Sequence, residues 1–163
     1  MLDLIPDAFV DVDARFLEPA AGNGNFLVAI LERKVAAIDP AVTGSAYEFA
    51  VLRCLVSIYG VDISGDNVEE ARERMLAIAT AAAAFDDGDA SAAFVRAAEA
   101  ILATNVVIGD SLNAADQIVF VEYTPLPGER FQRLSSELVS PEMDLFYEPP
   151  SPLPTVHYSE LGA

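Results

Sequence analysis

The spacing of apolar and polar positions along the first two thirds of the chain predicts helices that alternate with short strands. Residues 25–36 carry apolar side chains at helical spacing, which is typical of a helix with one face in a core. In chain order, the expected elements are a helix at 2–9, a strand at 14–17, helices at 25–36 and 47–55, a strand at 57–63, helices at 67–80 and 91–103, and a strand at 105–108, with a turn at 86–89. This order favours an α/β fold with a parallel sheet covered by helices.

The last quarter of the chain has a different pattern. Residues 117–123 are β-branched and aromatic and predict a further strand, and a turn signal follows at 125–128. Seven of the ten prolines lie from Pro125 onward. We therefore expect a main domain over residues 1–124, with an added strand or hairpin, and a Pro-rich C-terminal extension over residues 125–163. The extension is expected to pack on that domain or on a partner.

Composition narrows the class of protein. Hydrophobic residues make up 53% of the chain, which is enough for a packed core. The single cysteine, Cys54, excludes an internal disulfide and suits a reducing cytoplasm, and with one histidine no structural zinc site is expected. The most apolar stretch, residues 75–85, is too short to cross a bilayer. A cytoplasmic protein without a membrane partner is therefore expected.

The formal charge of −17 bears on possible partners. Nine Lys and Arg stand against 26 Asp and Glu, whereas nucleic-acid binders usually present a basic face to phosphate groups. Contact with DNA is therefore expected only through a partner. A soluble acidic surface, adaptation to salt, docking on a basic partner and mimicry of DNA all remain open. Residues 69–74 carry mixed Glu and Arg, which is typical of a solvated helix face with local ion pairs.

The strongest local motif reads FLEPAAGNGNFL over residues 16–27. Glu18 comes at the end of a predicted strand, and two glycines permit a tight turn close to a ligand. The helix that follows points its N-terminus toward that ligand. A dinucleotide fingerprint needs a third glycine, which is missing here. A carboxylate directly before the loop also suits a cationic ligand better than a pyrophosphate. The plain structural alternative is a Gly-rich turn before a helix.

This run resembles motif I of the N6-adenine (amino) DNA methyltransferases, whose pattern is acidic-Pro-Ala-x-Gly-x-Gly-x-Phe. The resemblance implies a Rossmann-like class I methyltransferase fold, with residues 1–124 as the domain that binds S-adenosylmethionine. The ammonium and sulfonium groups of this cofactor suit a carboxylate at the end of a strand. The positions that the resemblance assigns to the cofactor are Glu18, Pro19, Ala20, Gly22, Gly24, Asn25 and Phe26.

Two further segments follow in the order of that family. Asp62 and Ile63 end the second predicted strand, where motif II places an acceptor for the ribose hydroxyls and an apolar contact for adenine. Asp110 and Ser111, in Gly-Asp-Ser-Leu after the third strand, resemble motif III, whose Asp accepts from the adenine amino group. A helix cap for Asp62 and a simple turn for Asp110 are the structural alternatives.

The catalytic motif of the family has no counterpart. Motif IV, Asn/Asp-Pro-Pro-Tyr/Phe, holds the target amine and stacks the flipped base, and the nearest string here is Glu148-Pro149-Pro150-Ser151. Glu148 is a weak candidate acceptor, and Ser151 offers no stacking face. The N-terminal Thr-Pro motif of the family is also missing. We therefore expect an S-adenosylmethionine-binding domain that needs a partner for methyl transfer or that is inactive, with an acidic interaction or anti-restriction protein on a degenerate methyltransferase fold as the alternative.

Without the strand that leads to motif IV, the first strand would expose an apolar edge, which proteins normally cover. We expect either that residues 117–123 lie beside the first strand or that another chain does. That chain would be a second copy in a homo-oligomer or a second protein.

Overall fold

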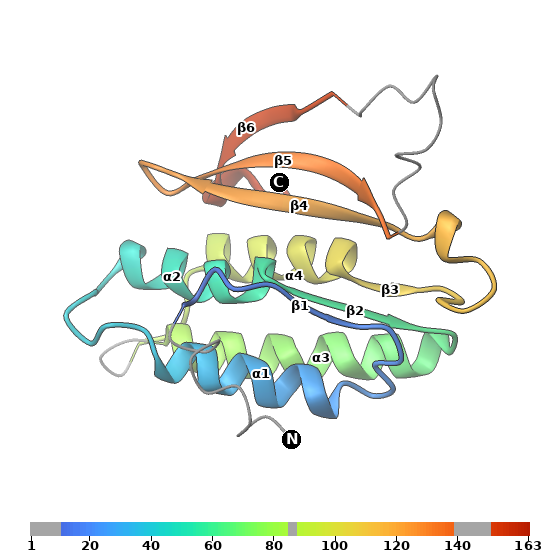
Figure 1. The fold of residues 1–163 in the computed structure, drawn as a ribbon. Helices are drawn as coiled ribbons and strands as arrows, with labels where there is room; N and C mark the ends of the chain where they lie inside the picture. The colour runs from blue at the N-terminus through green and yellow to red at the C-terminus, as the bar shows by residue number, and fades with distance from the viewer. Residues whose placement is uncertain (1–10, 85–87, 139–150) are drawn as a thin grey trace.

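The computed structural model describes residues 11–84, 88–138 and 151–163 and has the mixed α/β architecture that the sequence predicts (Figure 1). Its elements are β1 (Phe16–Glu18), α1 (Asn25–Ala36), α2 (Ser45–Val56), β2 (Ile58–Asp62), α3 (Gly65–Ala83), α4 (Ala92–Asn105), β3 (Val106–Ile108), the 3-10 helix η3 (Ala115–Gln117), β4 (Val119–Leu126), β5 (Arg130–Glu137), β6 (Leu153–His157) and the 3-10 helix η4 (Tyr158–Glu160). The helix expected at 2–9 and residues 86 and 87 of the expected turn lie outside the described residues.

The first three strands form a parallel sheet in the order β1-β2-β3, so the predicted parallel sheet is confirmed. Phe16 lies opposite Ile58, and Gly60 lies opposite Val106. Because all three strands run the same way, the loops that leave their carboxyl ends emerge at the same edge of the sheet. The three sequence motifs lie on those loops.

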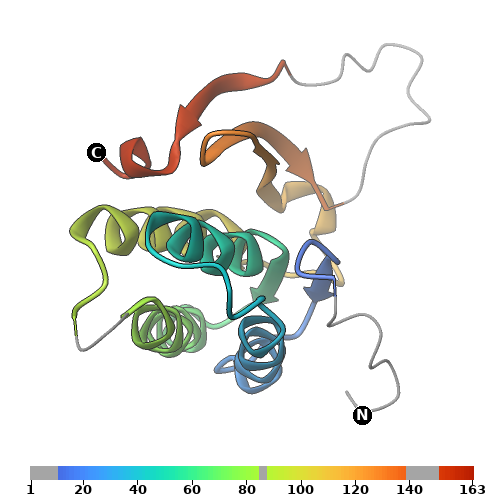
Figure 2. The ribbon, with the colours of Figure 1, turned by 90° about the vertical axis from the view of Figure 1, so that its left-hand side faces the viewer.

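The molecule is layered around this sheet. Helices α1 and α3 lie side by side on one side, the sheet β4-β5-β6 lies on the opposite side, and α2, α4 and the parallel sheet lie between them (Figures 1 and 2). Large side chains that are fully buried in the core include Leu27, Ile30, Leu31, Leu52, Leu55, Ile58, Met75, Phe94, Ile101 and Phe131. Of the helices in the described ranges, none combines the length and the apolar character needed to cross a membrane.

The strand predicted at 14–17 begins at Phe16 because the residues before it have another role. Lys34 of α1 is fully buried, and its Nζ donates to the carbonyl oxygens of Val12 at 2.8 Å and Ala14 at 2.7 Å. The ammonium also lies 5.1 Å from the centre of the Phe16 ring. Burial lowers the pKa of Lys34. The segment that leads into β1 is therefore fixed to α1 by a lysine rather than by a sheet ladder.

The second sheet is antiparallel, in the order β4-β5-β6. The strand predicted at 117–123 appears as β4, but its partner is β5, and it makes no ladder with β1. The prediction that this strand lies beside the first strand is therefore wrong. The alternative, that a second chain covers the edge of β1, stays a prediction. β4 also runs across the domain boundary expected at residue 124. Pro125 is tolerated in β4 because this is an edge strand of its sheet.

Side chains rather than backbone hydrogen bonds join the two sheets. The ring of Tyr59 on β2 meets that of Phe120 on β4 edge to face, with 5.3 Å between their centres. Ile118 and Val61 complete a small buried cluster with these rings. A Cβ on Gly109 would lie 2.7 Å from a side-chain atom of Ile118, so this contact needs glycine. The second sheet therefore covers the face of the parallel sheet that α1 and α3 leave open.

Candidate functional site

Three loops meet around a cavity of about 270 Å³ at the carboxyl edge of the parallel sheet. This volume is near the lower end of the range of small-molecule sites, roughly 300–1,000 Å³. The cavity is lined by Pro19, Ala20, Asp62, Ile63, Gly109, Asp110, Ser111, Leu112 and Asn113. The structure thus brings together residues from all three sequence motifs, which lie far apart along the chain.

The loop after β1 depends on glycine at two positions with different surroundings. Gly24 has a φ of 83°, and a Cβ there would lie 2.8 Å from the Cβ of Ala71 on α3. Gly22 has a φ of 53°, but nothing lies within 4 Å of the position of its Cβ. Gly24 therefore lets α1 approach α3 closely, whereas Gly22 leaves open space beside the loop backbone.

Asp62 ties the first two loops together. Its Oδ2 accepts from the N–H of Gly22 at 2.8 Å, and its Oδ1 accepts from the N–H of Ser64 at 2.9 Å and from the amide of Asn67 at 3.0 Å. These bonds, with Ser64 the largest cause, lower the pKa of Asp62. Each carboxylate oxygen has about two acceptor positions. Within the described part of the chain Oδ2 receives one bond, so it retains capacity for a ligand hydroxyl.

The loop after β3 is built around Asp110. Its Oδ1 accepts from the N–H groups of Leu112 and Asn113, both at 3.0 Å, and its Oδ2 accepts from the Asn113 amide at 2.8 Å. The Asn113 side chain is the largest cause of the lowered pKa of Asp110. The Oγ of Ser111 donates to the carbonyl of Pro19 at 2.8 Å and links this loop to the first. Two cavity-lining side chains, Ile63 and Leu112, are largely exposed.

The remaining predicted positions, Glu18, Gly22, Gly24, Asn25 and Phe26, are not among the residues that line the cavity. The Oε1 of Glu18 accepts from the N–H of Ala20 at 3.1 Å and closes the turn after β1. Asn25 is exposed at the start of α1, and Phe26 is partly buried and packs against the core. Glu148, the weak catalytic candidate, lies outside the described residues.

Charged residues of α3 support the site in a way that the sequence interpretation missed. Arg74 donates to the carbonyl of Asn23 at 2.7 Å, and the amide of Asn23 donates to Glu70 at 2.9 Å. Arg72 donates to the carbonyl of Val106 at 2.8 Å. The helix face at residues 69–74, predicted to be solvated, therefore includes side chains that form hydrogen bonds with the glycine loop and with the start of β3. Helical spacing gives no signal for this, because the partners are backbone atoms distant in sequence.

The charged groups in the cavity lining are all negative. Among its lining residues are two carboxylates and no Lys, Arg or His. Such a lining disfavours phosphate groups and suits ligands with hydroxyl, amine or cationic groups. The described residues contain no group of three or more His, Cys, Asp or Glu side chains arranged to hold a metal ion.

No protein-family model matches the chain, and neither a curated protein nor a solved structure matches it.

Proposed function

We propose that this chain is an S-adenosylmethionine-binding domain with a Rossmann-like methyltransferase fold, and that the cavity holds S-adenosylmethionine or its demethylated product. The observation that carries the proposal is the convergence of Pro19, Asp62 and Asp110 on one cavity. Each lies at or just after the carboxyl end of a different strand of the parallel sheet. In open α/β sheets, ligands bind outside the carboxyl ends of the strands, and the cavity has that position.

The chemistry of the lining suits the parts of this cofactor. The Oδ2 of Asp62 offers an acceptor for a ribose hydroxyl. The carboxylate of Asp110 provides an acceptor near the exposed side chains of Ile63 and Leu112, which supply apolar contact for the adenine ring. Glu18 adds negative charge beside the loop, which favours the ammonium and sulfonium groups. A dinucleotide or nucleoside triphosphate would instead place phosphates beside uncompensated carboxylates.

Methyl transfer to adenine in DNA is proposed only for a complex. The flipped base needs a hydrogen-bond acceptor and a stacking face, and the three motifs supply neither. The charge of −17 also opposes the approach of DNA phosphates. A partner that contributes the base pocket and a basic DNA-binding surface would remove both obstacles. Without such a partner the domain binds cofactor but does not transfer methyl groups.

Ligand selectivity tests the proposal. Isothermal titration should detect S-adenosylmethionine and S-adenosylhomocysteine with dissociation constants in the micromolar range, about −8 kcal/mol. NAD⁺ and ATP should bind at least about tenfold more weakly, because their phosphates meet Asp62 and Asp110. Equal binding of all four ligands, or tighter binding of the phosphate-bearing pair, would contradict the proposal.

The net charge supports a second candidate function. A chain of charge −17 is suited to docking on a basic surface such as a DNA-binding groove. If neither S-adenosylmethionine nor S-adenosylhomocysteine binds, an acidic interaction or anti-restriction protein on a degenerate methyltransferase fold becomes the better proposal. Competition between the chain and duplex DNA for a DNA-modifying enzyme would then test it.

A further inference from the structure

The outer edge of β1 has backbone groups available for another strand. β1 lies at one end of the sheet order and pairs with β2 alone. The N–H of Phe16 donates to the carbonyl of Ser57 at 2.8 Å, toward β2. Because the direction of the hydrogen-bonding groups alternates along a strand, the N–H and C=O of Leu17 point to the open side. Within the described residues no strand pairs with β1 there.

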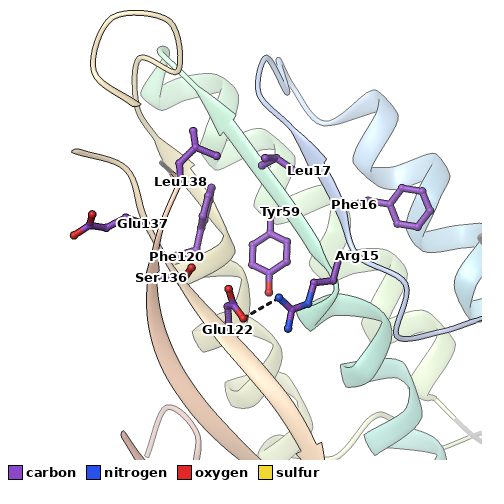
Figure 3. A pocket seen from close by; sticks show the side chains of 9 residues that line it. All are labelled: Arg15, Phe16, Leu17, Tyr59, Phe120, Glu122, Ser136, Glu137 and Leu138. Carbon is purple, nitrogen blue, oxygen red and sulfur yellow. Dashed lines mark hydrogen bonds and ion pairs between the residues drawn. The ribbon is translucent and has the colours of Figure 1, made fainter. Parts of the chain in front are cut away.

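A cavity of about 280 Å³ lies beside this edge, between the parallel sheet and the β4-β5 hairpin (Figure 3). Leu17 and Tyr59 point into it, whereas the ring of Phe16 points away toward α1. Phe120 and Leu138 form the opposite wall. Leu17 is 47% exposed, so this apolar side chain, at an edge that no described strand covers, faces a cavity whose walls combine aromatic and aliphatic groups with the Arg15–Glu122 pair, Ser136 and Glu137.

The charges around this edge indicate the kind of occupant. Arg15 is paired with Glu122 at 2.8 Å and Arg53 with Asp13, whereas Glu18 at the end of β1 and Glu137 at the cavity add negative charge. The whole chain carries −17. A second copy would bring the same excess of negative charge to the contact, whereas a basic partner would be attracted.

We propose that β1 is the docking edge for an extended segment of a positively charged partner protein. The segment adds a strand beside β1, exchanges backbone hydrogen bonds with Leu17 and places an apolar side chain in the cavity beside Tyr59. Side chains alternate along a strand, so apolar residues at every second position fill the cavity side, while Lys or Arg between them lie on the other face of the added strand, near Glu18. The proposal does not rest on cofactor binding, and Asp62→Asn should leave the docking unchanged.

Four fluorescent octapeptides test the proposal, each with Lys at odd positions and Val, Leu, Ile or Phe at even positions. Binding is measured by fluorescence polarisation in physiological salt, where diffuse electrostatic attraction is screened. At least one alternating peptide should bind the folded chain, and a block peptide of the same composition should bind at least about tenfold more weakly, because only alternation satisfies both faces of an added strand. In hydrogen exchange, the amide of Leu17 should become protected when the alternating peptide is present.

Two edge variants localise the contact. Leu17→Pro removes the outward N–H and should weaken the peptide at least about tenfold. Ile108→Pro makes the equivalent change on the opposite edge strand, β3, and should alter binding less than twofold. If Leu17→Pro unfolds the chain, Leu17→Lys serves instead, because it keeps the backbone and adds a repelling charge. Circular dichroism checks the fold of each variant.

The following outcomes overturn the proposal. They are failure of all four alternating peptides to bind, equal loss of binding in the two proline variants, and an unchanged exchange rate at Leu17. A dimer in light scattering that Leu17→Lys converts to a monomer also overturns it, because the occupant would then be a second copy of this chain.

Discussion

The Oδ2 of Asp62 accepts a hydrogen bond of 2.8 Å from the backbone N–H of Gly22, which lies 40 residues earlier in the chain. This bond joins the end of β2 to the glycine loop after β1, and it fixes the distance between two of the three loops that surround the cavity. The acidic residue therefore shapes the loop before any ligand is present. A ligand hydroxyl at Oδ2 would join an arrangement that the protein already holds in place.

The two glycines of the first loop should differ in their tolerance of alanine. Gly24→Ala combines a φ of 83° with a contact of 2.8 Å to the Cβ of Ala71, so it should lower the free energy of unfolding by about 2–4 kcal/mol. Gly22→Ala has the unfavourable φ but open space, and it should lower that free energy by only about 1–2 kcal/mol. Urea denaturation measures both, with Gly128→Ala, at a φ of 77° in open space, as the control. Equal effects at Gly22 and Gly24 would contradict the close approach of α1 to α3.

Lys34 is the only lysine of the chain and is fully buried. Amine-reactive esters should therefore modify the folded protein at Lys34 at least about 100-fold more slowly than the urea-unfolded protein, because modification requires opening of the structure around α1. Peptide mass spectrometry after timed labelling measures the two rates, with the α-amino group of Met1 distinguished as a separate site. Similar labelling rates in buffer and in urea would show that the ammonium is not held against the carbonyls of Val12 and Ala14.

Cys54 should make the protein less stable at alkaline pH. Burial raises the pKa of its thiol to about 12, from an ordinary value of 9.0. A group whose pKa is raised by folding contributes stability below its unfolded pKa and loses it as the pH rises toward the folded pKa. From pH 8 to pH 10, the free energy of unfolding should therefore fall by about 1 kcal/mol more in the native chain than in Cys54→Ala. Lys34 also titrates, with the opposite effect on stability, and because its charge interacts with Cys54 the difference between the two proteins reports the pair.

Urea titrations of the native chain and of Cys54→Ala at pH 7, 8, 9 and 10 give that difference. The series ends at pH 10, the ordinary pKa of Tyr59, because burial raises the pKa of this phenol to about 12 and its titration would destabilise both proteins at higher pH. A constant difference between the two proteins across the series would show that the thiol is accessible to water.

The sequence predicts the parallel sheet because its signals are local. The glycine loop, the apolar run that forms β2 and the helical spacing of residues 25–36 each act within one segment. The partner of β4 was not predictable in the same way, because strand propensity does not specify which edge a strand joins. Here a tight turn at Gly128 and Glu129, with φ values of 77° and 56°, joins β4 to β5. The backbone hydrogen bonds of β4 are therefore made with the strand that follows it in the chain rather than with β1.

The residues of the candidate site likewise fall into two groups, those that local sequence signals predict and those whose role depends on the fold. Asp62 and Asp110 were identified from their places at strand ends, and the structure sets both at one cavity. The roles of Arg74 and Lys34 could not be predicted, because each binds backbone carbonyls brought near only by folding. A charged side chain on a helix gives no local signal of whether it reaches water or a distant carbonyl.

The most direct test of the central claim is titration of S-adenosylhomocysteine into Asp62→Asn and Asp66→Asn by calorimetry. Both variants remove one negative charge, but Asp66 is exposed on the first turn of α3 and lies outside the cavity lining. The account predicts binding at least about tenfold weaker in Asp62→Asn, a loss of about 1.4 kcal/mol or more, and nearly native binding in Asp66→Asn. Equal affinities in the two variants, or no binding to the native chain, would contradict the assignment of this cavity to the cofactor.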